Sequence, residues 1–363
     1  MTNQTNAQVV GLFERYIHAD EFAGAGLVVR KHGQPIIEYY AGSSAPGVEA
    51  GPDVLWPIAS ISKVYAAAAI MRLIERGALT LNTLVCQLLP SFSGADREQV
   101  RLRHLLTHTA GMIYESPEME QRLRAQTPLA DMVAEALESQ LLFAPGTSVS
   151  YADYHYLIAG RMAEQATGQS LAELVQQLVL TPAGLQETFF PPSPAEYARI
   201  AKIRGALAEG SAGSMYNSPY ALALAHPAFG VVATVRDLAY FALHFMPGGP
   251  RIHHEATVQA MIADQTGGAP GTHPAMRGYS ATGAMPWGLG WYLQRPSVPA
   301  VLADLASFSA FGHGGASGCL LVADPAQHLV VAIVSNTHVR TGAERWRMRL
   351  QSIANLAIAL HAS

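Results

Sequence analysis

The pattern with the greatest chemical potential in this sequence is a serine followed three residues later by a lysine, Ser60 and Lys63. Only three lysines occur among the 23 basic residues of the 363-residue chain. Residues three apart on a helix lie on the same face, and a lysine removed from water can give up its proton, which an arginine cannot. The pair can therefore supply an activated serine nucleophile. The alternative is a serine at a helix start with an ordinary lysine in its first turn.

Two further segments carry residues suited to the same chemistry. Tyr151 follows a Pro-Gly turn, directly precedes an expected helix, and is followed two residues later by Asp153. The glycine-rich run at residues 311–318 enters an expected strand.

Together with the stretches Leu105–Met112, Phe229–Leu238 and Trp287–Trp291, these segments resemble the serine β-lactamase-like superfamily. The branch is the one that holds class C β-lactamases, family VIII carboxylesterases, D-amino-acid amidases and aminopeptidases, and DD-peptidases. In this resemblance Ser60 to Lys63 is the S-x-x-K element, Tyr151-Ala152-Asp153 stands for Y-x-N, and His313-Gly314-Gly315 stands for K-T-G. Order and spacing agree over nearly the whole chain.

The resemblance implies hydrolysis through an acyl-enzyme, without a metal or an organic cofactor. Ser60 would be the nucleophile, and Tyr151 and Lys63 would share the task of accepting its proton. The backbone N–H groups of Ser60 and Ala316 would bind the oxyanion.

Other residues would form the substrate site. Gly314 and Gly315 would leave room for substrate beside the strand. Trp287 is expected either to line the substrate cleft between the lobes or to pack in the core.

Two departures from the family pattern bear on the substrate. His313 stands where β-lactamases usually have a lysine that holds a carboxylate, and imidazole is mostly neutral at pH 7. Asp153 stands where an asparagine usually donates an N–H, and a carboxylate only accepts. We expect Asp153 to pair with Lys63 and to favour the ammonium form, which leaves the base role to Tyr151.

Both departures weaken recognition of an acylamino carboxylate. The prediction is a carboxylesterase acting on small or short-chain esters. A D-amino-acid amidase or aminopeptidase, a weak β-lactamase and an acyltransferase remain alternatives.

Hydrophobic periodicity predicts an α/β (α+β) fold, with an antiparallel sheet flanked by N- and C-terminal helices and joined to an all-helical lobe. We expect one catalytic domain over residues 1–363, with a sheet lobe formed by residues 1–59 and about 285–363 and a helical lobe at about 60–284. The predicted helices are 7–18, 60–77, 98–107, 128–140, 154–168, 170–179, 238–246, 255–262 and 340–360, and the predicted strands are 26–30, 35–40, 288–293, 319–322 and 329–334. Residues 267–283 read as a long loop over the cleft.

Composition limits the partners. Half of the residues are hydrophobic, 14% are charged and the net charge is −4, with no basic stripe for nucleic acid. No apolar run is long enough to span a membrane, and the first residues lack a signal-peptide pattern, so a cytoplasmic location is expected. The expected partner is a small ester or amide substrate, and the oligomeric state is left open.

Several other residues are expected to have structural roles. His104 and His108 lack the third ligand of a zinc site, Tyr154 and Tyr156 are expected to pack, and Cys86 and Cys319 are expected to be free thiols. No G-x-S-x-G element occurs, which excludes the α/β-hydrolase pattern.

Overall fold

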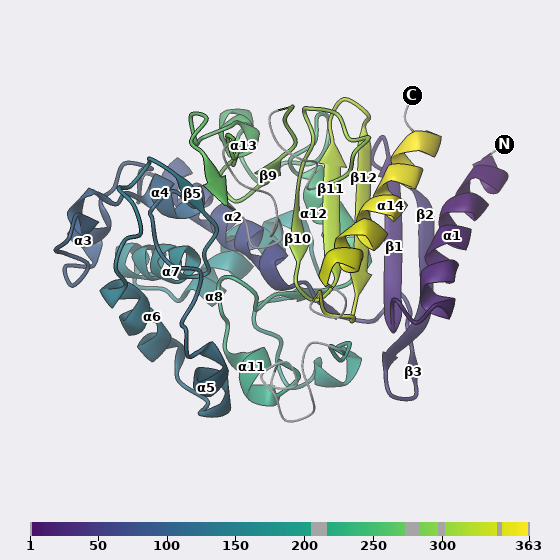
Figure 1. Cartoon of the computed structure of the whole chain (residues 1–363), viewed down its shortest axis with the longest axis horizontal. Helices are drawn as coiled ribbons and strands as arrows, with labels where there is room; N and C mark the ends of the chain where they lie inside the picture. Colours follow the sequence, from purple (N-terminus) through teal and green to yellow (C-terminus); the bar gives the residue numbers. More distant parts are fainter. Residues whose placement is uncertain (1, 205–215, 273–282, 297–301, 340–342, 362–363) are drawn as a thin grey trace.

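The structure is a computed structural model that describes residues 2–204, 216–272, 283–296, 302–339 and 343–361. Within these residues, both ends of the chain build one antiparallel sheet of seven strands in the order β3-β2-β1-β12-β11-β10-β9 (Figure 1). The strands are β1 Gly24–Lys31, β2 Gln34–Ala45, β3 Val48–Glu49, β9 Tyr292–Leu293, β10 Phe311–Gly315, β11 Cys319–Asp324 and β12 Leu329–Ser335. The antiparallel sheet fold that the sequence predicts is confirmed.

Helices cover both faces of this sheet. The terminal helices α1 and α14 pack together on one face, and α12 packs against β1, β11 and β12 on the other (Figure 1). The helices within the described residues are α1 Thr2–His18, η1 Ala59–Ile61, α2 Ser62–Glu75, α3 Val85–Leu88, η2 Arg97–Gln99, α4 Leu102–Leu106, α5 Met119–Arg124, α6 Leu129–Glu138, α7 Tyr154–Thr167, α8 Leu171–Val175, η3 Gln176–Leu180, α9 Thr181–Ala183, η4 Tyr197–Arg199, α11 Pro219–Ala223, α12 Val235–Leu243, α13 Glu255–Ile262 and α14 Ala343–His361.

Alternation along the strands assigns side chains to the two faces. In β1, Leu27 and Val29 belong to the cluster beneath α1 and α14, whereas Val28 belongs to the cluster shared with α12 and the helical lobe. β12 repeats this division, with Val331 on the first face and Ala332 on the second. Because both faces are buried, these strands are hydrophobic at nearly every position.

The helical lobe is built around α2 and α7, which pack on each other and on α4, α6 and α8. Residues 66–69 of α2 are alanines, the strongest helix formers, and their small side chains allow close packing. Smaller pairings connect the lobe to the rest: β4 Trp56–Pro57, β7 Val232–Ala233 and β6 Thr188–Phe189 form one sheet, and β5 Val149–Ser150 pairs with β8 Gly271–Thr272.

One predicted helix, at residues 98–107, is interrupted. Val100 and Arg101 are extended between η2 and α4, and Arg101 forms a β-bridge with Leu84. This long-range bridge replaces the helical hydrogen bonds that the local periodicity favours.

The predicted strand at 288–293 is also shorter than expected. Only Tyr292–Leu293 belongs to the sheet, because Gly290 has a φ of 92° that no regular strand contains. Of the predicted loop at 267–283, residues 271–272 form β8, and 273–282 lie outside the described residues. No helix in the described part of the chain is both long and apolar enough to cross a membrane.

Candidate active site

Ser60 lies in the 3-10 turn η1, directly before α2. The preceding residue, Ala59, has a left-handed φ of 46°, which turns the chain sharply out of β4 and into the helix. Ser60 remains partly exposed, whereas Lys63, the second residue of α2, is fully buried. The Lys63 Nζ is 3.1 Å from Ser60 Oγ. The spacing of the two residues thus brings their reactive atoms into contact.

Three acceptors surround the Lys63 Nζ among the described residues. They are Ser60 Oγ at 3.1 Å, Asp153 Oδ1 at 2.7 Å and the Ala228 carbonyl oxygen at 3.3 Å. An ammonium group has three N–H donors and no acceptor, so this surrounding matches the charged form of lysine. Asp153 immediately precedes α7, but its carboxylate pairs with Lys63 and does not cap the free N–H groups of that helix.

Tyr151 arrives from the segment between β5 and α7. Its phenol oxygen is hydrogen-bonded to the Ser60 side chain, and Lys63 Nζ lies 4.6 Å from the centre of its ring. Only 5% of Tyr151 is exposed. The structure therefore brings together Ser60, Lys63 and Tyr151, although Tyr151 lies 88 positions after Lys63 in the chain.

Burial and charge act on the two proton-carrying groups in opposite directions. Burial lowers the pKa of Lys63, and the adjacent carboxylate of Asp153 opposes that shift. Burial raises the pKa of Tyr151 well above its usual value; Asp153 raises it further, while the Ser60 hydrogen bond lowers it. Because the groups are in contact, the pair has shared macroscopic pKa values rather than independent ones.

The strand β10 closes the other side of the site. A Cβ at Gly315 would overlap the carbonyl oxygen of Ile58, so this glycine lets β10 lie directly against the turn that carries Ser60. The expectation that Gly315 leaves room for substrate is therefore wrong, because backbone fills that space. Gly314 and Ala316 keep partial exposure, as does Ser60.

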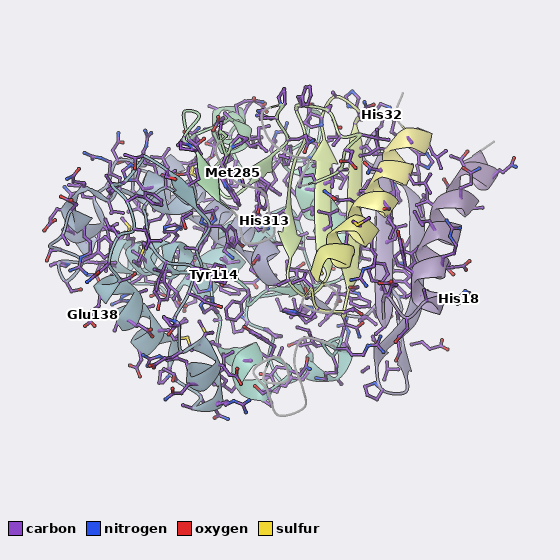
Figure 2. All side chains as sticks on the ribbon, in the orientation of Figure 1. His18, His32, Tyr114, Glu138, Met285 and His313 are labelled. Carbon is purple, nitrogen blue, oxygen red and sulfur yellow. The ribbon has the colours of Figure 1, made fainter. Side chains whose placement is uncertain are left out.

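His313 lies in β10 beside the site and is 1% exposed (Figure 2). Burial, and then the charge of Lys63, lower its pKa to about 3. Its Nδ1 is 2.7 Å from the Gly314 carbonyl oxygen and donates to it, since that oxygen can only accept. The other nitrogen, Nε2, is thus a neutral acceptor, which has no partner among the described residues.

Tyr151 is one member of a row of stacked aromatic rings. Tyr114, Tyr151, Trp287 and Tyr292 follow one another at centroid distances of 5.9, 5.7 and 4.0 Å. Tyr114, labelled in Figure 2, is 36% exposed, but Trp287 is fully buried. Trp287 therefore supports Tyr151 from within the core, and the expectation that it lines the substrate cleft is corrected.

Residue-type reasoning missed two contributors. The Ala228 carbonyl could not be identified from residue type, because every residue carries a backbone carbonyl and only the path of the backbone decides where it lies. His108 was expected only to have a structural role, and the structure shows that it hydrogen-bonds the backbone on both sides of Tyr151. Its sequence signal is a histidine within Leu105–Met112, a segment that resembles the family and in which His108 was considered only as part of an incomplete zinc site.

The remaining residues expected to be structural are histidines, tyrosines and cysteines. Among the described residues, no group of three metal-ligating side chains occurs. Tyr154 and Tyr156 are buried in the core, and Cys86 and Cys319 are unpaired cysteines.

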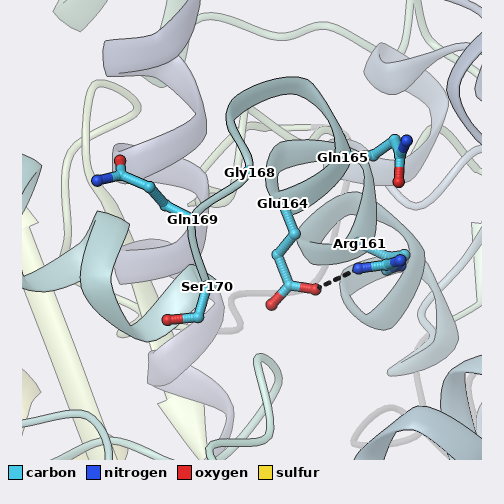
Figure 3. Close-up of a pocket in the computed structure, with 6 residues that line it drawn as sticks. All are labelled: Arg161, Glu164, Gln165, Gly168, Gln169 and Ser170. Carbon is cyan, nitrogen blue, oxygen red and sulfur yellow. Dashed lines mark hydrogen bonds and ion pairs between the residues drawn. The ribbon is translucent and has the colours of Figure 1, made fainter.

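A shallow pocket of about 390 Å³ lies away from these residues, at the corner between α7 and α8 (Figure 3). An ion pair of 3.3 Å joins Arg161 and Glu164 at its wall. The pocket lies at the end of α7 opposite Asp153, and its polar surface residues show no arrangement for catalysis.

Comparison with known proteins gives a family match over most of the chain. The family model described as Beta-lactamase matches residues 9–354. Penicillin-binding protein 4 of Amycolatopsis lactamdurans is 30% identical over 313 residues, which cover 81% of this chain and 75% of that protein. Esterase EstB of Burkholderia gladioli is 30% identical over 203 residues, 51% of each chain.

A solved structure of similar fold is EstCE1, described as a hydrolase with promiscuous acyltransferase activity. It superposes with a TM-score of 0.78 at 22% identity, over 96% of this chain and 98% of EstCE1. At this identity the likeness establishes the fold.

Proposed function

This chain belongs to the beta-lactamase family and is a serine hydrolase of that fold, and on that basis we propose that it hydrolyses small neutral esters through an acyl-enzyme on Ser60. Relatives include proteins named as esterases and as penicillin-binding proteins, so family membership does not choose between ester and amide. The observation that carries the proposal is the shared contact of Ser60 with Lys63 Nζ at 3.1 Å and with the Tyr151 phenol.

In the proposed reactive form the Lys63–Tyr151 pair is one proton short, with Lys63 as ammonium and Tyr151 as phenolate. Burial lowers the pKa of Lys63 and so favours loss of the pair's proton from that amine, which can then take the phenol proton and leave Tyr151 as the phenolate. Asp153 and Ala228 hold the ammonium, which lies 4.6 Å from the centre of the Tyr151 ring. Its positive charge stabilises the phenolate. Tyr151 then accepts the Ser60 proton as Oγ attacks.

The Ser60 Oγ–C bond forms while the carbonyl becomes an oxyanion, which the N–H groups of Ser60 and Ala316 bind. Collapse breaks the ester C–O bond, and Tyr151 returns the proton to the leaving alkoxide, which departs as the alcohol. Water then attacks the acyl-enzyme; its proton passes through Tyr151 to Ser60 Oγ, and the acid is released.

Two features support neutral esters over substrates that carry a carboxylate. His313 is neutral, and its unbound Nε2 is an acceptor, so it offers no donor to an anion. Asp153 adds a negative charge where an amide N–H would bind the acylamino carbonyl of an amide or β-lactam. Esters also need less leaving-group protonation than amides do.

The test compares p-nitrophenyl acetate and butyrate with nitrocefin and a D-amino-acid amide. We expect rapid ester turnover by the wild type, little or none of the other two substrates, and loss of turnover in Ser60→Ala. Ser93→Ala, at an exposed serine, is the matched control and should retain full activity. Faster amide than ester turnover would contradict the proposed substrate, and activity that survives Ser60→Ala would contradict the mechanism.

A further inference from the structure

His108 binds the backbone on both sides of Tyr151. Its carbonyl oxygen accepts a hydrogen bond from the N–H of Ser150 at 2.8 Å. Its Nδ1 accepts one from the N–H of Ala152 at 3.2 Å. The imidazole lies 4.5 Å from the Tyr151 ring, centre to centre, and the residue is fully buried. The chain that carries the phenol is thus fixed immediately before and immediately after it.

The proton arrangement of this contact follows from its neighbours. A backbone N–H can only donate, so Nδ1 of His108 is an acceptor and its ring proton is on Nε2. His155 Nδ1, 2.9 Å from the same atom, must then be a donor. Burial, followed by the charge of Lys63, lowers the pKa of His155 to about 3, so His155 is neutral and keeps the single donor proton that this contact requires.

The backbone of His108 has an unusual conformation, and hydrogen bonds hold the residues that follow it. Its φ is 59°, a left-handed value that histidine, asparagine and aspartate tolerate better than most residues. The following residues are also held: the carbonyl of Thr109 accepts from Gly146 at 2.8 Å, and that of Gly111 accepts from Leu142 at 2.6 Å. The segment after α4 therefore forms a rigid support for residues 142–152.

We propose that His108 is a positioning residue that holds the Tyr151 phenol oxygen against Ser60. This inference rests on the proposed function, in which Tyr151 accepts the Ser60 proton. Tyr151 needs such a support because it lies between the two-residue strand β5 and the start of α7, outside any regular hydrogen-bonded element. A displacement of a reacting group by about 1 Å can cost roughly 100-fold in rate.

The experiment compares His108→Ala, which removes the ring acceptor, with His108→Asn. Asparagine accepts the left-handed φ, and its side-chain oxygen can replace Nδ1 as an acceptor. We expect kcat for p-nitrophenyl butyrate to fall roughly 100-fold in His108→Ala with KM little changed, and we expect His108→Asn to restore much of the loss. His244→Ala, which removes another buried imidazole at the C-terminal end of α12, should lower the melting temperature without this loss of kcat.

A double-mutant cycle with Tyr151→Phe separates positioning from general damage. If His108 acts through Tyr151, His108→Ala should cause little further loss once the phenol is absent. Losses that multiply in the double mutant, or a His108→Asn variant as inactive as His108→Ala, would overturn the inference. If Tyr151→Phe alone keeps wild-type turnover, the proposed function fails instead, which distinguishes the two outcomes.

Discussion

At the scale of single residues, the carboxylate of Asp153 influences both proton-carrying groups of the site. It lies 2.7 Å from Lys63 Nζ and raises the pKa of both Lys63 and Tyr151. Glu115 acts in the same direction with a smaller contribution. The position that usually holds an amide donor in this family therefore controls when the Lys63–Tyr151 pair loses its proton.

Replacing this charge should move the pH dependence of the enzyme. In Asp153→Asn both pKa values fall, so the pair loses its proton at lower pH and the acidic limb of kcat/KM shifts to lower pH. Glu115→Gln should give a smaller shift in the same direction. The measurement is kcat/KM for p-nitrophenyl acetate across pH; an unchanged limb, or one displaced upward, would contradict the assignment.

The sequence can identify those site residues whose function depends on the type and spacing of their side chains. The spacing of Ser60 and Lys63 predicts one pair of this kind, the resemblance to the family adds Tyr151 and Asp153, and the structure brings all four together. The contact of Lys63 with the Ala228 carbonyl could not be selected, because it depends on the path of the backbone rather than on side-chain type. The burial of Trp287 could not be predicted from the sequence either, because an aromatic residue is equally suited to the wall of a site and to the core.

At the scale of elements, the site depends on how closely β10 approaches the turn η1. Gly315 is the point of contact, and the carbonyl of Ile58 occupies the space that a side chain would need. Ser60 follows Ile58 by two residues and Ala316 directly follows Gly315, so we infer that this contact influences the separation of the two N–H groups proposed to bind the oxyanion. It explains a glycine whose φ does not itself require one.

Gly315→Ala should force these two elements apart. We expect a loss of about 1–3 kcal/mol in unfolding free energy from overpacking. Since the oxyanion donors separate, kcat should also fall, by up to the roughly 100-fold typical of losing one such donor. Gly51→Ala is the matched control, because its added Cβ meets open space at an ordinary φ. Unchanged kcat in Gly315→Ala, measured beside its urea unfolding curve, would show that this contact does not set the site.

Element boundaries were predictable where local pattern and tertiary contacts agree. The helix expected at 255–262 is α13, with the same ends. The helix expected at 170–179 instead passes from α8 into the π-helical turn η3. Its apolar residues remain buried, but the hydrogen-bond pattern that they adopt is a product of packing and is not encoded in their periodicity.

At the scale of the whole molecule, the two ends of the chain are held together by a buried ion pair. Arg349 of α14 donates to the Glu21 carboxylate and to its backbone oxygen, both at 2.6 Å, and its guanidinium lies 5.7 Å from the Phe22 ring centre. Arg349 is only 4% exposed. This contact closes the layer of α1 and α14 over the sheet, on the face away from α12.

Arg349→Met should therefore destabilise the fold with little effect on catalysis. Loss of hydrogen bonds to a charged group predicts a decrease of roughly 1.5–3 kcal/mol in unfolding free energy. Arg124→Met removes an exposed pair with Glu120 and should cost about 0.5 kcal/mol or less. Chemical denaturation measures both variants, and equal stability of the two would contradict the structural role of Arg349.

The central claim is that Ser60 carries the acyl group during turnover, and rapid-quench mass spectrometry tests it most directly. Wild-type protein mixed with p-nitrophenyl butyrate should carry one butyryl group on the tryptic peptide of residues 32–63, and fragmentation should place it on Ser60 rather than Ser62. The label should be absent in Ser60→Ala and should form more slowly in Tyr151→Phe. A butyryl group on another residue, or equal labelling of Ser60→Ala, would contradict the account.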